Sequence, residues 1–360
     1  MLWDMNTTLT TAALLTLTLG TVSMAQEVGM DLHQPARLSS MSKSSSMAQS
    51  VAAQSMGFTG KGVTVALIDS GVDSTHPDLV GVVVEEVCFC MDENGAPCCP
   101  NGTTRQAGVG SAKDDNGHGT HLAGIIAGRG RIATKGMAPE AHIVSIKVAD
   151  AYGSTSTWAM IAALDWLVTN RKDVKVVNMS LGTNATYAGA CDQASAVTAS
   201  LASLGNVLRD RGTVIVTAAG NSGLMNQMTA PACVTGFISV GAVYSKSDRT
   251  ASANGCTDAK TSADRVACFS NSSSTLSILA PGAGIVSAKM GGGKANRSGT
   301  SQAAAVITGT VALLLEAAPS GSSQMESALR GSGVSVTDSR NGRVTPRLDA
   351  RAALTVLGGL

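Results

Sequence analysis

Three short segments of the sequence carry side chains whose types and order suit the cleavage of an acyl bond. They are VALIDSGVD with Asp69, NGHGTHLAG with His118 and SGTSQAAA with Ser301. A serine hydroxyl is a weak nucleophile at neutral pH, so a neutral imidazole must accept its proton during attack. A buried carboxylate then holds the imidazole in one tautomer and stabilises it once it is charged. The segments therefore predict a nucleophile, a base and an acid.

A fourth segment, VIVTAAGNSG, predicts the group that stabilises the reaction intermediate. It is an apolar run that ends in small residues and Asn221. Attack by a serine creates an oxyanion, which needs hydrogen-bond donors that are already in place. We expect the carboxamide of Asn221 and the backbone N–H of Ser301 to be two such donors, with the neighbouring glycines leaving room for a substrate backbone.

The elements around these segments are predicted to place the side chains at one edge of a sheet. Residues 63–68 form an apolar run that is typical of a parallel strand covered on both faces. Asp69 follows at the carboxyl end of that strand, where open α/β sheets gather functional groups. Glycines on both sides of His118 allow a tight turn into a helix over 121–127. Ser301 is expected to open a helix over 303–315, whose N-terminal dipole favours negative charge.

The remaining histidines are interpreted as structural. His121 lies three residues after His118, and H-x-x-H without a third ligand is weak support for zinc. His76 and His142 are expected to pack or to hydrogen-bond locally, and His33 lies in a polar leader. Taken singly, DSG or GTS is usually a turn or a helix cap. The presence of four such segments in order favours an enzyme and predicts no catalytic metal.

As a set, these motifs resemble the subtilisin-like serine proteases from about residue 57 to residue 357. Further stretches that look like that family occur in its order: KGVTVALIDSGVDSTHPDL, GMAPEAHIVSIKV, VVNMSLG, ISVGAV, ILAPGAGIVSA and TDSRNGRVTPRLDARAAL. The resemblance implies an α/β fold, a single three-layer domain with a central, mostly parallel sheet covered by helices on both faces. It implies Asp69, His118 and Ser301 as the triad and Asn221 as the side-chain oxyanion donor.

The resemblance also implies where a polypeptide substrate binds. The expected substrate-binding residues line the specificity pocket and the edge that pairs with an extended chain: Gly153, Ser154, Ser180, Leu181, Gly182 and Gly220. Such pairing recognises peptide conformation more than sequence. No acidic cluster is evident in these segments, so we expect a broad endopeptidase that prefers apolar or aromatic residues before the scissile bond.

The helix after Ser301 departs from the family pattern Met-Ala-x-Pro-His-Val-Ala-Gly. This chain has Gln302, a run of alanines, Val, Ile and Thr308 instead. Alanine suits a helix interior better than proline, so the helix is expected to persist. Its packing beneath Ser301 can differ, and a displacement of about 1 Å can cost roughly a hundredfold in rate. One alternative is therefore a secreted pseudoprotease or peptide-binding module; another is an esterase or amidase with the same acyl-enzyme.

Eight cysteines, an even number, indicate four disulfides in an oxidising compartment. The resemblance implies a Cys191–Cys233 pair. Cys256 and Cys268 bracket a polar insertion and are expected to close it as a loop. The other four, at positions 88, 90, 98 and 99, surround the turn 93–95 and predict a doubly cross-linked hairpin with open connectivity. A four-thiolate zinc site is the alternative there, and the spacing fits C-x-x-C patterns poorly.

The amino-terminal region is predicted to direct export. Residues 8–22 are apolar and Thr-rich, and Ser23-Met24-Ala25 resembles a signal-peptidase site. We therefore predict a signal peptide over 1–25, a short polar leader or linker over 26–50 and the catalytic domain over 51–360. The stretch is too short and too hydroxylated for a membrane span. The expected location is secreted or periplasmic.

Composition agrees with one globular α/β domain and excludes some partners. The chain has 360 residues, 44% of them hydrophobic and 14% charged, with a net charge of +1. No basic block is present, so nucleic acid is not an expected partner. Residues 128–135 form a short, basic loop without Asn or Asp, so a structural calcium ion is not supported by the sequence. We expect a monomer that needs no cofactor for catalysis.

Overall fold

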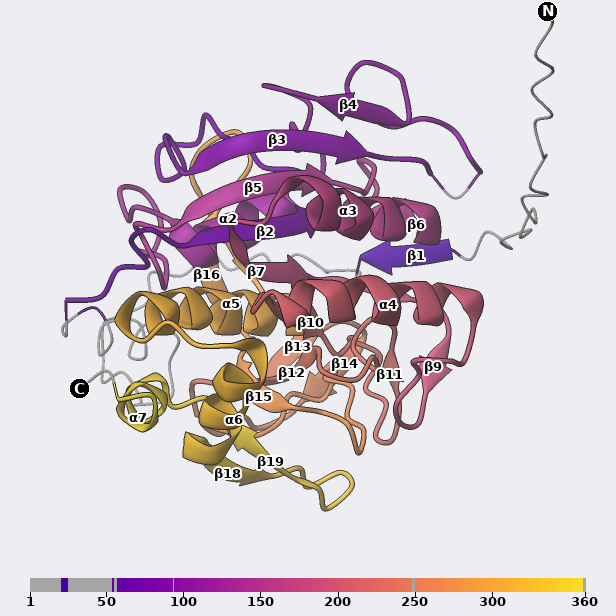
Figure 1. Ribbon diagram of the computed structural model, residues 1–360. Coiled ribbons are helices and arrows are strands. Elements are labelled where there is room, and N and C mark those ends of the chain that lie inside the picture. Colours follow the sequence, from indigo (N-terminus) through magenta and orange to yellow (C-terminus); the bar gives the residue numbers. More distant parts are fainter. Residues whose placement is uncertain (1–20, 25–53, 55–56, 93, 248–249, 359–360) are drawn as a thin grey trace, which may run out of the picture.

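The computed structural model describes residues 21–24, 54, 57–92, 94–247 and 250–358, with side chains from residue 54 onward (Figure 1). Apart from residues 21–24, the predicted signal peptide and polar leader lie outside these residues. A ten-stranded sheet forms the centre, in the order β18-β19-β15-β12-β10-β7-β2-β5-β3-β4. All neighbouring pairs from β19 to β3 are parallel, and the two outermost pairs are antiparallel.

The strands of this sheet are β2 (Thr64–Asp69), β3 (Val83–Phe89), β4 (Arg105–Ala107), β5 (His142–Lys147), β7 (Val174–Met179), β10 (Val214–Ala218), β12 (Ile238–Val243), β15 (Ile278–Pro281), β18 (Val334–Thr337) and β19 (Val344–Arg347). Smaller sheets are formed by β1 (Thr21–Met24), β6 (Ser154–Ser156) and β8 (Leu181–Thr183), by β9 (Thr186–Tyr187) and β11 (Met228–Thr229), by β13 (Ala251–Ala253) and β14 (Cys256–Asp258), and by β16 (Ile285–Ala288) and β17 (Lys294–Arg297). The helices are α2 (His118–Ala127), α3 (Thr157–Asn170), α4 (Ala196–Asp210), α5 (Thr300–Ala317), α6 (Ser322–Ser332) and α7 (Ala350–Val356).

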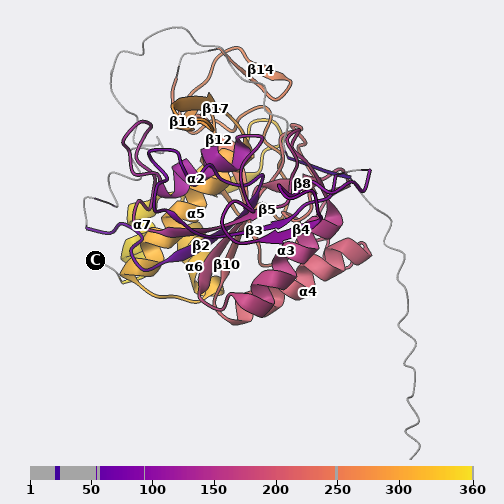
Figure 2. The ribbon, with the colours of Figure 1, turned by 90° about the horizontal axis from the view of Figure 1, so that it is seen from above.

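Helices cover both faces of the sheet, as Figure 2 shows for α2 and α5 on one side and α3 and α4 on the other. Strand β2 illustrates the cause. Val65 and Leu67 enter the core beneath α2 and α5, whereas Ala66 and Ile68 enter the core beneath α3 and α4. Side chains alternate between the faces of a strand, so an apolar run builds two cores at once. The expected three-layer α/β fold is confirmed.

The helix that follows Ser301 is continuous despite its departures from the family pattern. It extends over Thr300–Ala317, beyond the expected 303–315, and begins after Gly299. Every residue from Thr300 to Leu315 is buried. This helix has a mean hydropathy of 1.3 and is the one described helix long and apolar enough to cross a membrane, yet 89% of it is buried inside the fold, as a core helix is.

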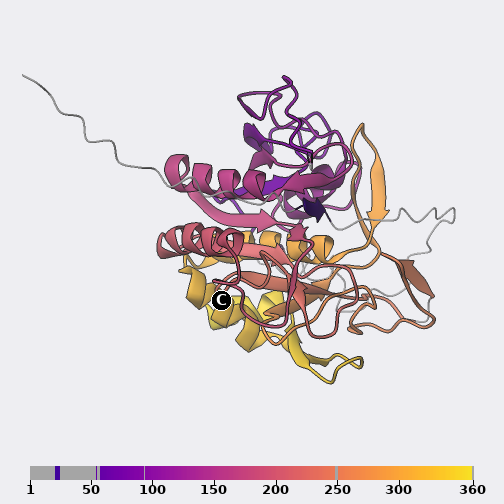
Figure 3. The same ribbon diagram turned by 90° about the vertical axis from the view of Figure 1, so that its right-hand side faces the viewer.

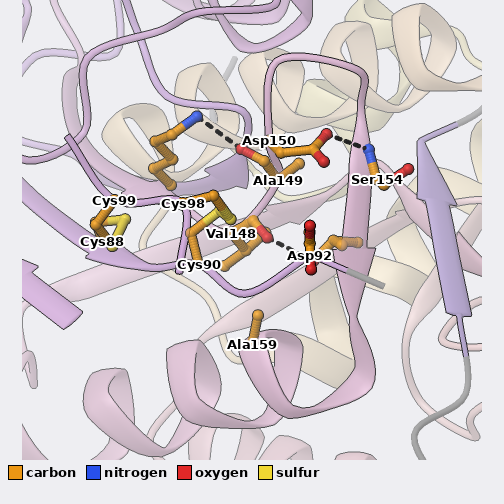
Figure 4. Close-up of a disulfide and its surroundings, with 12 residues drawn as sticks. Cys88, Cys90, Asp92, Cys98, Cys99, Val148, Ala149, Asp150, Ser154 and Ala159 are labelled. Carbon is orange, nitrogen blue, oxygen red and sulfur yellow. Dashed lines mark hydrogen bonds between the residues drawn. A yellow bond between two sulfur atoms is a disulfide. The ribbon is translucent and has the colours of Figure 1, made fainter. Parts of the chain in front are cut away.

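Four disulfides cross-link the described residues. They join Cys191 to Cys233, Cys256 to Cys268, Cys88 to Cys99 and Cys90 to Cys98. The last two form the doubly cross-linked hairpin expected from the sequence and settle its connectivity. Figure 4 shows the Cys90–Cys98 bond beside Val148 and Ala149, which lead from β5 towards β6. The register places Cys88 of β3 opposite Lys147, the last residue of β5, so the Cys88–Cys99 cross-link lies next to the strand that leads into that segment.

Candidate active site

Strand β2 and helix α2 bring Asp69 and His118 into direct contact. Asp69 is the last residue of β2 and His118 the first of α2, and both are buried. The imidazole Nδ1 lies 2.7 Å from Asp69 Oδ1, which also accepts the backbone N–H of Ser70 at 2.8 Å. With the Nδ1 proton donated to the carboxylate, Nε2 carries the lone pair. This is the tautomer in which an imidazole accepts a proton through Nε2.

A buried carboxylate that the sequence analysis missed, Asp114, holds these two elements together. Its Oδ1 accepts the Ser70 hydroxyl at 2.8 Å and the N–H of Gly117 at 2.9 Å. Its Oδ2 accepts the N–H of Thr120 at 3.0 Å in the first turn of α2. Asp114 thus joins the loop after β2 to the start of α2. An acidic residue just before a glycine-flanked helix start was the available signal, since carboxylates favour helix N-termini.

A second missed residue, Lys147, lies next to Asp69 in the sheet. The register pairs Asp69 of β2 with Lys147 of β5, whose side chain is fully buried. Its ammonium donates to the carbonyls of Ser70 at 3.0 Å and Ala149 at 2.6 Å and to Asp115 Oδ1 at 2.6 Å. A buried ammonium needs all of its protons satisfied. Lys147 and Asp114 therefore both hold the loop after β2, through the carbonyl and the hydroxyl of Ser70.

Asn221 lies beside the start of α5 with its amide group oriented by Thr300. Its Oδ1 accepts both the N–H and the hydroxyl of Thr300, each at 2.8 Å. The Thr300 hydroxyl in turn accepts the N–H of Gly220 at 3.1 Å. Because Oδ1 faces Thr300, Nδ2 points elsewhere; it is buried and has no hydrogen-bond partner among the described residues. A fixed, unused donor next to Ser301 has the property that an oxyanion requires.

Ser301 occupies the first turn of α5 and is fully buried. Its hydroxyl has no hydrogen-bond partner within the described part of the chain, so the expected bond to His118 is not formed there. Its carbonyl lies 3.4 Å from the hydroxyl of Ser180. Catalytic hydrogen bonds are often long without substrate and tighten only in the complex. The structure thus joins Asp69 to His118, and Asn221 to the turn that carries Ser301.

The small sheet β6-β1-β8 forms a seat for an extended chain. Strand β1, the end of the predicted signal peptide, lies antiparallel between β6 and β8, and Figure 1 shows β1 next to β6. Ser23 pairs with Ser154 on one side and with Gly182 on the other. These two partners are among the residues expected to bind substrate backbone. The edges of β6 and β8 that β1 occupies here therefore suit a peptide strand bound through main-chain hydrogen bonds.

A cavity of about 560 Å³ adjoins this seat. The predicted residues Ser180, Leu181 and Gly182 line it together with Gly220 and Asn221. Gly153 lies instead at the turn that leads into β6, with a φ of 83° that favours glycine. None of the residues that line the cavity is charged.

Thr308, one of the residues that depart from the family pattern, belongs to a buried hydrogen-bond network that reaches the cavity wall at Ser180. Asn178, near the end of β7, donates from Nδ2 to the Thr308 hydroxyl at 2.8 Å. Its Oδ1 accepts the hydroxyl of Ser180 at 3.0 Å. The hydroxyl that is unusual at this position therefore holds α5 against β7 and against the pocket wall.

Replacing Thr308 by valine is expected to lower the free energy of unfolding by about 1–3 kcal/mol, because it leaves the buried Asn178 amide unpaired. Guanidinium titrations on a Ser301→Ala background would measure this loss without self-digestion. Thr310→Val is the matched control, since the buried Thr310 hydroxyl bonds only the carbonyl of Val306 one turn earlier. Equal losses for the two variants would contradict the proposed network.

Of the other histidines, His33 lies outside the described residues, and His121 and His76 are buried against main-chain carbonyls. His121 is fully buried, with Nε2 3.3 Å from the carbonyl of Ala295, and burial together with the charge of Arg297 lowers its pKa to about 3. It is therefore neutral when folded. His76 is buried, with Nε2 2.7 Å from the carbonyl of Gly293, and His142 is exposed at the start of β5.

The loop over residues 128–135 is held in place by hydrogen bonds to the side chain of Asp78. Asp78 is buried, and its side-chain oxygens accept the backbone N–H groups of Arg131, Ile132 and Ala133. These bonds use both oxygens of the carboxylate. Within the described residues, no group of three or more His, Cys, Asp or Glu side chains is placed to hold a metal ion.

Fold and site together define a three-layer α/β protein with a buried Asp69–His118 pair at the carboxyl end of a parallel strand. Residues 60–338 match the model of the subtilase family, and the chain belongs to that family. It is 34% identical to subtilisin E of Bacillus subtilis (strain 168) over 272 residues, which cover 74% of this chain and 59% of that protein. It is also 34% identical to subtilisin Savinase of Lederbergia lenta over 276 residues, 76% of this chain and 84% of that protein.

Solved structures agree on the fold. A cold-adapted subtilisin-like serine proteinase has a TM-score of 0.61 and 28% identity, with 81% of this chain and 90% of that chain covered. A protease of Pseudoalteromonas arctica has a TM-score of 0.66 at 24% identity, covering 85% of this chain and 92% of that one, and supports the fold alone.

Proposed function

We propose that this chain is a serine endopeptidase that cleaves polypeptides through an acyl-enzyme on Ser301. The observation that carries the proposal is the seat between β6 and β8, where β1 pairs as the central strand and β8 lines the cavity that contains Asn221. An esterase has no need of such a seat, because main-chain pairing recognises peptides. Family membership supports the same class of reaction.

In the proposed mechanism, His118 Nε2 accepts the Ser301 proton as the hydroxyl oxygen attacks the scissile carbonyl. Asp69 keeps the imidazole in the required tautomer and stabilises its positive charge. Asn221 Nδ2 and the Ser301 N–H donate to the oxyanion of the tetrahedral intermediate. His118 then returns the proton to the leaving amine, and water hydrolyses the acyl-enzyme by the same steps in reverse.

The residues around the cavity support a preference for apolar or aromatic side chains before the scissile bond. The lining residues are uncharged, so no carboxylate is available there to bind Lys or Arg. We propose Ser180, Leu181, Gly182 and Gly220 as contacts for that side chain and its backbone, and Gly153 and Ser154 as the opposite edge.

Four disulfides and the relationship to subtilisins support an extracellular protein. We further propose that residues 1–25 direct export and that the enzyme is a monomer.

The test of the proposed function is covalent labelling with a serine-reactive phosphonate. Wild-type protein is expected to bind one equivalent at Ser301, mapped by mass spectrometry, and casein hydrolysis is expected to fall in proportion to labelling. Ser301→Ala is the unlabelled control. A folded, disulfide-bonded wild-type protein that takes up no phosphonate would favour the pseudoprotease alternative instead.

The residue after the nucleophile predicts resistance to oxidation. Gln302 is fully buried next to Ser301, at a position where related proteases are expected to carry methionine. A thioether there is oxidised to a bulkier, polar sulfoxide, which a carboxamide cannot form. Casein hydrolysis by the wild type is therefore expected to survive mild peroxide, whereas Gln302→Met should be inactivated. Equal loss in both proteins would show that another residue limits oxidative stability.

A further inference from the structure

Two walls of the cavity beside the substrate seat converge on a single hydroxyl group. The first wall is formed by residues 180–183 and the second by residues 220–222, and Thr229 of β11 also lines the cavity. A Cβ atom on Gly182 would lie 2.7 Å from Thr229 Oγ1, and a Cβ atom on Gly220 would lie 3.5 Å from it. Thr229 therefore forms the floor on which the two walls meet.

Hydrogen bonds hold both walls in place. On the first wall, the N–H of Thr183 donates to the carbonyl of Ala230 at 2.9 Å, and the Thr183 hydroxyl accepts the N–H of Ala230 at 3.2 Å. These bonds join the wall to the residue that follows Thr229. On the second wall, Asn271 Oδ1 accepts the N–H groups of Ser222 and Leu224, each at 3.0 Å. The position of the floor relative to the walls is thus fixed.

The two facing glycines leave a slot that suits a flat side chain. Leu181 enters the core beneath α3 and α4, so Gly182, the next residue of β8, faces the other way. Gly220 has a φ of 103°, which favours glycine. Because neither residue has a side chain, both walls are backbone at this depth. An aromatic ring is planar and rigid, and it can enter such a slot with its far end towards Thr229.

The hydroxyl on the floor is not used by the protein. Thr229 Oγ1 is buried and has no hydrogen-bond partner within the described part of the chain. By contrast, the hydroxyl of Thr186, which pairs with Thr229 across β9 and β11, donates to Gln227 Oε1 at 2.8 Å. A hydroxyl can donate one hydrogen bond and accept two, and leaving it buried and unpaired is unfavourable. The floor therefore suits a polar group at the tip of a bound side chain.

A second unpaired polar atom lies in another part of the lining. Asn254 Oδ1 is buried without a partner among the described residues, and Asn254 Nδ2 donates to the carbonyl of Ser298 at 3.1 Å. Asn254 lies in the turn between β13 and β14, and Figure 3 shows this hairpin at the right-hand end of the molecule, below the orange β16–β17 hairpin. This atom is tied to the segment before Ser301, whereas Thr229 lies between the two walls.

The direction of β1 indicates which substrate residue lies beside the slot. Met24 lies opposite Leu181, so a chain that continues in the same direction reaches Ser180 next. The Ser180 hydroxyl lies 3.4 Å from the carbonyl of Ser301 and borders the cavity. The last substrate residue on the first wall is therefore the one before the scissile bond, and its side chain is the one that can enter the slot.

We infer that Thr229 is a specificity-determining residue that selects tyrosine over phenylalanine before the scissile bond. The ring lies between the walls at Gly182 and Gly220, and the phenol O–H donates to Thr229 Oγ1. Phenylalanine fills the same slot but leaves this hydroxyl unpaired. The inference rests on the proposed endopeptidase function and narrows its preference for apolar or aromatic residues to an aromatic residue with a polar tip.

Two internally quenched peptides that differ only in Tyr or Phe before the scissile bond would test this inference. The wild type is expected to favour Tyr by about fivefold in kcat/KM, the effect of one hydrogen bond between neutral groups. Thr229→Val keeps the shape of the side chain without the hydroxyl and should reduce this ratio to about one. Thr229→Ser keeps the hydroxyl and should retain the preference. Thr186→Val is the matched control, and it should retain the wild-type ratio because that hydroxyl is already bonded to Gln227.

The ratio within each variant separates specificity from support of the fold. Equal cleavage of both peptides by the wild type would overturn the inference. A preference for Tyr that persists in Thr229→Val would overturn it too, and would assign the preference to another group of the lining such as Asn254. A parallel fall for both peptides at an unchanged ratio would make Thr229 a support for the walls, against the inference. Labelling of wild-type Ser301 by the phosphonate together with equal cleavage overturns the inference alone, whereas no labelling and no cleavage overturns the proposed function as well.

Discussion

Asp69→Asn is expected to lower kcat for a peptide substrate about ten-thousand-fold while the protein remains folded. An asparagine at this position can present its amide N–H to His118 Nδ1, 2.7 Å from the present carboxylate oxygen. The imidazole would then carry its proton on Nε2, the nitrogen that must accept the Ser301 proton. The variant also loses the negative charge that stabilises the imidazolium. Steady-state kinetics with one peptide substrate would measure both kcat and KM.

A matched control for this variant is Asp73→Asn in the loop that follows β2. The Asp73 carboxylate accepts from Thr75 and from the N–H of Gly291 rather than from a candidate catalytic group, so its loss is expected to leave kcat within about twofold. KM should change little in Asp69→Asn, because the substrate seat on β6 and β8 is intact. A decrease of less than tenfold in kcat would show that Asp69 does not set the tautomer of the base.

Local motifs were sufficient to predict where the candidate catalytic residues lie relative to the strands and helices. Asp69, His118, Asn221 and Ser301 each occupy a short segment whose strand or helix boundary is visible from apolar runs and glycines. The parallel sheet follows from strands that are apolar on both faces. The helix after Ser301 was expected because alanine is a better residue for a helix interior than the proline of the family pattern.

The residues that were missed act across long stretches of sequence. Thr308 reaches Asn178 over 130 residues, and Asn254 reaches Ser298 over 44. Lys147 becomes a neighbour of Asp69 only through the register of β5 on β2. Periodicity and motifs report the local chain, whereas these contacts depend on how the layers pack. The pairing within the cluster Cys88–Cys99 was open for the same reason, since spacing alone permits more than one connectivity.

Asn221→Ala is expected to lower kcat about 100- to 1000-fold with little change in KM, because the lost donor acts on charge that develops only in the transition state. Asn221→Asp should be impaired at least as strongly. It can still accept from the N–H and hydroxyl of Thr300, each now 2.8 Å from Oδ1, but it presents a negative charge where Nδ2 stood. The rate of phosphonate labelling at Ser301 should fall with kcat, since the adduct forms through a similar arrangement of oxygen atoms.

The variant Thr300→Ala tests whether the orientation of the Asn221 amide matters in addition to the presence of its Nδ2 donor. This variant removes the hydroxyl that bonds Asn221 Oδ1 and Gly220 N but keeps the backbone N–H that fixes the amide. We expect a decrease in kcat of about tenfold, between that of the wild type and that of Asn221→Ala, because one of two orienting bonds remains. A Thr300→Ala enzyme as slow as Asn221→Ala would mean that orientation of the amide, and not its mere presence, limits stabilisation of the oxyanion. An unchanged kcat in Asn221→Ala would assign the oxyanion to backbone donors alone.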